Sequence, residues 1–232
     1  MIEQIKVYFI TLLLLCMLVV QANIVHAVEK EKAYTELAAA YDEYFAEAMN
    51  RLHIPGVALA VVAEGDPVIL NGYGLACVDP EIPVDVNATL FRIGSVTKLI
   101  TATAVMQCVE KGLLDLEKDV NNYLVEWQLP HTYPQSITLR HLLTHTAGFD
   151  DRFLELGVRN PAELEALGVY LQRRLPRRIA PPGEAFNYSN FGITLAAHLV
   201  ESVTGQSYMN YVEEHLFRPL EMLPDEIGRA HV

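Results

Sequence analysis

The stretch FRIGSVTKLI, residues 91–100, places Ser95 and Lys98 three positions apart at the start of a long apolar run. Between residues 96 and 109, Lys98 is the only charged residue, and apolar residues and threonines occur on all sides. A helix without a polar face is typical of the centre of a domain. The sequence therefore predicts a buried helix over residues 96–112.

Ser95 and Lys98 together have the composition of an activated nucleophile. A lysine in apolar surroundings serves as a base near neutral pH, because burial disfavours its charged form. Ser95 lies one helical turn away on the same face, at a helix N-terminus that favours developing negative charge. A hydroxyl, an adjacent base and backbone donors support covalent catalysis. The alternative is a serine N-cap followed by a lysine whose ammonium group reaches solvent.

A second candidate segment is FNYSN, residues 186–190, directly before an expected helix. Tyr188 and Asn190 alternate in an extended segment, so their side chains can point the same way. A tyrosine beside a lysine can relay a proton, and an asparagine can hold a substrate amide. The alternative is that Asn190 caps the helix over residues 191–204 and Tyr188 packs.

The first half of the remaining chain predicts a helix and a hairpin. Apolar residues at spacings of three and four predict an amphipathic helix over residues 34–52. Two apolar runs, residues 57–63 and 67–74, predict an antiparallel hairpin with a tight turn. A further helix is expected to begin after Thr138 and to stop at Gly148.

The second half predicts mainly helices. Asn160-Pro161 has the cap-then-proline pattern of a helix start. Residues 180–190 predict a loop, and residues 191–204 and 207–217 predict helices separated at Gly205. The whole pattern predicts one α/β domain without a second domain boundary, in which helices flank an antiparallel sheet.

The N-terminal segment and the net charge limit the cellular compartment and the partners that the sequence allows. Residues 1–27 have a short apolar core and small residues before the expected cleavage point at Ala27, which is typical of a secretory signal peptide. The alternative is an uncleaved membrane anchor; either places the remainder outside the cytoplasmic membrane. A net charge of −12 argues against a nucleic-acid partner. The basic segment RRLPRR, residues 173–178, is interpreted as a solvated loop.

The three cysteines do not form a disulfide framework. Cys16 lies in the expected signal peptide. Cys77 and Cys108 can pair in an oxidising compartment, but the position of Cys108 in an apolar helix favours buried thiols.

Ser95-Val-Thr-Lys98 and Tyr188-Ser-Asn190 together resemble the motifs of the serine β-lactamase and penicillin-binding-protein superfamily. The tyrosine motif resembles the branch of class C β-lactamases, D,D-peptidases and related esterases. The resemblance extends along most of the chain, through HIPGVALAVV, ITLRHLLTHTAGF, PPGEAFNYSN and FRPLEML.

The resemblance implies an extracytoplasmic serine hydrolase that cleaves an amide or ester of a small molecule or peptide. Ser95 would form an acyl-enzyme, Lys98 and Tyr188 would share the acid and base roles, and Asn190 would orient the substrate. No metal or organic cofactor is implied. The alternative is a non-hydrolytic β-lactam or peptide sensor, or an inactive remnant.

The resemblance also implies a third motif, a Lys or His followed by a small residue and Gly, and further C-terminal strands, which nothing after Asn190 matches. The final residues 227–232, IGRAHV, are encoded by ATC-GGA-AGA-GCA-CAC-GTC, which matches a common sequencing adapter. We therefore expect an incomplete hydrolase domain over residues 28–226, a non-native tail over 227–232, and little activity from this chain. Genomic DNA with a stop codon directly after IGRAHV would contradict this expectation.

A zinc hydrolase is the rival from another class of enzyme. His141 and His145 are four positions apart on an expected helix, a spacing that can bind zinc. However, Leu142 stands where zinc proteases carry a glutamate, and no third ligand is evident.

Overall fold

The computed structural model describes residues 2–150, 160 and 163–222. The chain forms two compact units, Met1–Thr89 and Leu90–Val232. The strands β1, β2 and β3 belong to the first unit, and the helices from α2 onward belong to the second.

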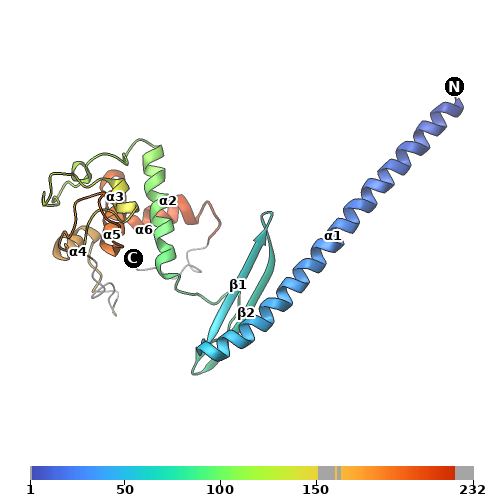
Figure 1. The fold of residues 1–232 in the computed structure, drawn as a ribbon, viewed down its shortest axis with the longest axis horizontal. Coiled ribbons are helices and arrows are strands. Elements are labelled where there is room, and N and C mark those ends of the chain that lie inside the picture. Colours follow the sequence, from blue (N-terminus) through green and yellow to red (C-terminus); the bar gives the residue numbers. More distant parts are fainter. Residues whose placement is uncertain (1, 151–159, 161–162, 223–232) are drawn as a thin grey trace. The chain divides into compact units, whose positions relative to one another are not determined.

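The first unit consists of a long helix and a small antiparallel sheet (Figure 1). Helix α1 is followed by three strands in the order β1-β2-β3. The predicted hairpin is confirmed, with its turn at Glu64 and Gly65, both of which have positive φ. The third strand, which pairs with the end of β2, was not predicted. The elements are α1 (Ile2–Leu52), β1 (Gly56–Ala63), β2 (Asp66–Val78) and β3 (Glu81–Pro83).

Aromatic and polar contacts fix α1 against β2. The rings of Phe45 and Tyr73 lie 4.9 Å apart, and the Tyr73 hydroxyl donates to Asp42 over 2.7 Å. The helix ends at Leu52, as its periodicity predicts, but it begins at Ile2 rather than near residue 34. In the part of the chain that the structure describes, no helix combines the length and hydrophobicity that a membrane span requires.

The second unit is helical and is organised around α5. Nine residues of α5 are buried, and α5 contacts four other helices of the unit (Figure 1). The helices are α2 (Thr97–Glu110), α3 (Leu139–Leu143), α4 (Leu167–Arg173), α5 (Asn190–Thr204) and α6 (Tyr208–Val212), with short 3₁₀ turns at Gly94–Val96 and Val120–Asn122 and a π-helical turn at Glu213–Phe217.

The bounds of α2 agree with the prediction, but its expected burial is wrong. Ala104 and Cys108 are fully buried, whereas the side chain of Leu99 is 65% exposed and that of Met106 is 45% exposed. Helix α2 is therefore buried on one side only, and Lys98 lies half-buried in its first turn.

Backbone conformation explains where the helix predictions succeed and fail. Gly205 has φ of +70° and ends α5 where expected, because glycine adopts this left-handed conformation without strain. Helix α3 ends at Leu143 rather than Gly148, since His145 already has φ of +57°. Pro161 of the expected cap-then-proline start lies outside the described residues, and the helix of this region, α4, begins at Leu167.

Candidate active site

Ser95 lies in the turn that leads into α2. Gly94 has φ of +54°, a conformation that glycine tolerates best, and the 3₁₀ turn Gly94–Val96 passes directly into the helix. Ser95 is exposed and Lys98 is half-buried. The Lys98 Nζ donates a hydrogen bond to Ser95 Oγ over 3.2 Å. The predicted serine–lysine pair is thus formed.

Tyr188 and Asn190 come to the same place from the other end of the unit. The Tyr188 hydroxyl donates to Ser95 Oγ over 2.7 Å, across 93 positions of sequence. The Lys98 Nζ donates to Asn190 Oδ1 over 2.7 Å and lies 4.9 Å from the centre of the Tyr188 ring. The structure therefore brings together all four residues that the sequence predicts for the site.

The arrangement suits proton transfer to and from Ser95. Two donors converge on its Oγ atom, and both distances lie within the range for general acid–base catalysis. Either Lys98 or Tyr188, in its deprotonated form, is close enough to accept the Ser95 proton. The aromatic ring and the cation also attract each other, which favours a fixed position for both.

The start of α5 explains why Tyr188 and Asn190 face Ser95. Ser189 between them is 3% exposed and caps the helix, because its Oγ accepts from the Gly192 N–H over 3.1 Å. The side chains on either side of a buried residue in an extended segment point the opposite way. The alternative that Asn190 caps this helix is wrong, and its side chain binds Lys98 instead.

His145 holds this segment, a role that the sequence did not predict, because it proposed His145 only as a zinc ligand of the rival hypothesis. Its Nδ1 accepts from the Ser189 N–H over 3.2 Å, and its carbonyl oxygen accepts from the Asn187 N–H over 2.8 Å. Its ring lies 4.4 Å from that of Tyr188 and meets Phe186 edge-on at 5.9 Å. His145 thus positions Tyr188 through both its backbone and its ring.

His141 has a different role, at the start of α3. Its Nδ1 accepts from the Thr138 N–H over 3.1 Å, while the Thr138 hydroxyl accepts from the His141 N–H; together these bonds form a capping box. Burial lowers the pKa of the His141 imidazole. The premise of the zinc hypothesis is wrong, because α3 ends before His145. Among the described residues, no three His, Cys, Asp or Glu side chains are grouped for a metal ion.

Comparison with known proteins gives a family match for most of the chain. The family model described as Beta-lactamase matches residues 41–230. A β-lactamase of Yersinia enterocolitica is 33% identical over 174 residues, which cover 75% of this chain and 42% of that enzyme. The curated relatives are longer proteins. This chain spans 35% of the length of a relative that is 28% identical and 42% of the β-lactamase that is 33% identical.

Two solved structures have a similar fold. The octameric penicillin-binding protein homologue of Pyrococcus abyssi has a TM-score of 0.69 and 30% identity, over 79% of this chain and 43% of that chain. EstCE1, a hydrolase with promiscuous acyltransferase activity, has a TM-score of 0.70 and 27% identity, over 82% of this chain and 52% of that chain. The structural match thus extends across most of the 232 residues.

Proposed function

This chain belongs to the Beta-lactamase family, and from that premise we propose that it hydrolyses an amide or ester through a covalent acyl-enzyme on Ser95. The observation that carries the proposal is the convergence of Lys98 Nζ and the Tyr188 hydroxyl on Ser95 Oγ. A serine hydroxyl with two proton-transferring partners, exposed at the start of a helix, suits attack on a carbonyl carbon.

In the proposed reaction, Ser95 Oγ attacks the substrate carbonyl as its proton passes to Lys98 or Tyr188. The Ser95 N–H stabilises the developing oxyanion. The tetrahedral intermediate collapses, and the leaving amine or alcohol takes a proton from the same pair. Water then attacks the acyl-enzyme with the pair acting as base. Asn190 holds Lys98 in place and orients the substrate amide.

The substrate class follows from the relatives only in broad terms. One relative is a β-lactamase, and a structural neighbour is a hydrolase with acyltransferase activity. We propose a small molecule or peptide with a β-lactam, D-Ala-type amide or ester bond. The composition of residues 1–27 supports export and an extracytoplasmic location, with residues 28–226 forming part of the hydrolase domain.

We further propose that catalysis needs sequence beyond residue 226. The resemblance implies an additional oxyanion donor on a later strand, and the loss of one such donor costs roughly 10²–10³ in rate. The 232-residue chain should therefore cleave an activated ester far more slowly than the protein encoded by the complete genomic locus. Equal rates for the two proteins would contradict this part of the proposal.

Covalent labelling tests the nucleophile. The full-length protein is treated with a fluorescent penicillin and with a fluorophosphonate, and the labelled peptide is identified by mass spectrometry. We expect modification of Ser95 by at least one probe and none in Ser95→Ala. Failure of both probes to label Ser95 would overturn the proposal. Labelling without turnover of a panel of β-lactams and esters would instead indicate a sensor.

A further inference from the structure

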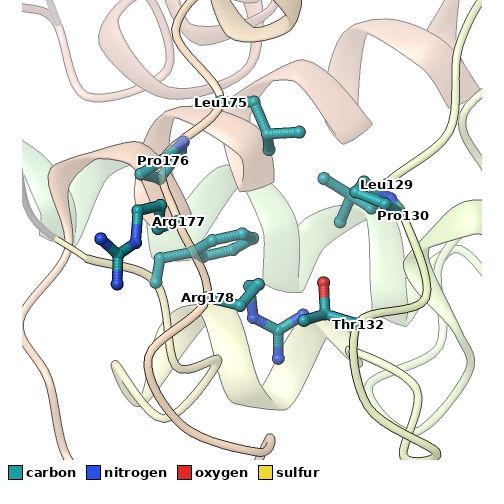
Figure 2. Close-up of a pocket in the computed structure, with 8 residues that line it drawn as sticks. Leu129, Pro130, Thr132, Leu175, Pro176, Arg177 and Arg178 are labelled. Carbon is teal, nitrogen blue, oxygen red and sulfur yellow. The ribbon is translucent and has the colours of Figure 1, made fainter.

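A cavity of about 320 Å³ lies in the second unit, apart from the candidate active site. None of Ser95, Lys98, Tyr188 and Asn190 lines it. Figure 2 shows Leu129 and Leu175 on its apolar side and Arg178 extending toward Thr132. Its size is at the lower end of the range for small-molecule sites, and a mostly apolar wall with few polar groups is typical of such sites.

The guanidinium of Arg178 lies close to two aromatic rings at this cavity. Its central carbon lies 5.2 Å from the centre of the Phe149 ring and 5.5 Å from that of Tyr133. The backbones of Phe149 and Arg178 also form a β-bridge, which fixes the stem of the side chain. An aromatic ring attracts the cation but does not replace the acceptors that the N–H groups of the guanidinium need.

Those acceptors are missing among the described residues. The Nε and Nη2 atoms of Arg178 are both shut off from solvent and have no hydrogen-bond partner. Burial accordingly lowers the pKa of this guanidinium. Buried donors are nearly always paired in native proteins, and an unpaired one costs about 1–3 kcal/mol, more for a charged group. The missing partner of Arg178 therefore needs an explanation.

Three other arginines of the same unit have acidic partners. Arg140, Arg173 and Arg218 each form an ion pair with a glutamate. Neither Arg177 nor Arg178 has such a pair within the described ranges. The prediction that residues 173–178 form a solvated loop is wrong for Arg178, which is half-buried. In a chain with a net charge of −12, the buried and unpaired guanidinium of Arg178 beside an apolar cavity favours the binding of an anion.

We propose that this cavity binds a small monocarboxylate with a compact apolar body. The carboxylate accepts from the forked Nε–Nη2 edge of Arg178, the geometry in which guanidinium and carboxylate match best, and from the Thr132 hydroxyl. Because Nε and Nη2 are closed to solvent in the unliganded structure, binding requires a change in the Arg178 side-chain torsions that turns this edge toward the cavity. The apolar body rests on Leu129 and Leu175. Water in the cavity could accept hydrogen bonds from the N–H groups. It would neither neutralise the positive charge of Arg178 nor cover the apolar wall.

Three probes of the unmodified full-length protein separate the parts of this proposal. Benzoate carries both charge and an apolar ring, benzamide has the same shape without charge, and inorganic phosphate has charge without the ring. Isothermal titration should show saturable benzoate binding, at least about tenfold tighter than that of either other probe, since hydrogen bonds to charged groups contribute more than neutral ones. Absent benzoate binding, equal binding of benzamide, or equal binding of phosphate would each overturn the proposal.

Matched variants locate the site. Arg178→Met should abolish benzoate binding without loss of thermal stability, because an apolar residue in place of an unpaired buried charge is neutral or stabilising. Arg177→Met removes the same charge one position away. The Arg177 side chain is exposed and points away from Arg178 in Figure 2. This variant should therefore change the affinity for benzoate less than about threefold. Equal losses in both variants would mean that only general charge attracts the ligand and would overturn the proposal.

Two more variants keep the test decisive if Arg178→Met does not fold. Thr132→Val, at an exposed position, should weaken benzoate binding several-fold because it removes one donor. Ser95→Ala should leave the affinity unchanged, because Ser95 does not line the cavity. Unchanged affinity in Thr132→Val, or lost affinity in Ser95→Ala, would contradict the proposed location. Ser95 labelling is read separately, so failure here and failure of the proposed hydrolase activity are distinguishable.

Discussion

At the scale of single residues, the site was predictable where its chemistry is local in sequence. Ser95 and Lys98 are one helical turn apart, and Tyr188 and Asn190 alternate along an extended segment, so spacing made each pair a candidate without excluding a capping role. The meeting of the two pairs was expected only from the family resemblance. His145 was missed because its key contact is to a backbone N–H 44 positions away, which no pattern of side chains reveals.

Substitutions of His145 test its role as a positioning residue for Tyr188. His145→Asn should retain acylation of Ser95 to within about tenfold, because asparagine tolerates positive φ and its Oδ1 can accept from the Ser189 N–H. His145→Gly relieves backbone strain but removes the acceptor and the ring, and should slow acylation by roughly 10². The rate constant of acylation by a fluorescent penicillin measures both.

The comparison of these two variants separates positioning from stability. Both accommodate φ of +57°, so equal melting temperatures with unequal acylation rates would support positioning. We expect the maximal acylation rate to change more than the apparent probe affinity. Equal acylation rates in the wild type and in both variants would show that His145 does not place Tyr188.

At the scale of elements, strong periodicity and glycine punctuation predicted α2, α5 and the β1–β2 hairpin. The two errors, in the end of α3 and in the burial of α2, have different physical causes. Helix α3 stops early because positive φ at His145 turns the chain toward the Tyr188 segment. The burial of α2 was overestimated because apolar residues such as Leu99 and Met106 also lie on its exposed side, so composition did not distinguish the two faces.

The capping box of α3 makes stability depend on pH. His141 has a lowered pKa in the folded protein because of burial, partly offset by Glu117 and reinforced by Arg140 and Arg178. Below the unfolded-state value of about 6.5, the unfolded chain therefore binds more protons than the folded one. The free energy of unfolding should fall as the pH falls through 6.5 and be insensitive to His141 above it.

His141→Gln isolates this effect. Glutamine at the third helical position completes the same capping box but does not titrate. Urea denaturation at pH 7.5 and pH 5.5 should show a smaller loss of stability in the variant than in the wild type. Identical losses would show that His141 makes no contribution to the pH dependence.

At the scale of the whole molecule, composition and motifs predicted the α/β class and the family, and the comparisons confirm both. The division into two compact units was not predicted, because no linker-like composition marks residue 89. The Arg178 cavity was also missed. A run of arginines looks like a solvated loop in the sequence, and only the structure shows that one of them is half-buried close to two aromatic rings.

The thiols provide a prediction for the molecule as a whole. Cys77 and Cys108 are free, Cys77 is half-buried, and burial raises the pKa of the Cys108 thiol. Thiolates are the reactive form, so Cys108 should resist alkylation in the native state. Iodoacetamide followed by mass spectrometry should modify Cys77 first and Cys108 only on unfolding. Native labelling of Cys108 as fast as Cys77, with Cys77→Ser as the control, would contradict the buried assignment.

The position of Asn190 at the first residue of α5 has a consequence for how activity is lost. Nine of the fifteen residues of helix α5 are buried, so its amide hydrogens should exchange with solvent among the slowest in the protein. The side chain that holds Lys98 is therefore attached to a segment that opens only with cooperative unfolding of the unit. Local fluctuations of the exposed turn therefore move Ser95 relative to Asn190, which stays in place. The proposed activity should persist until the unit unfolds.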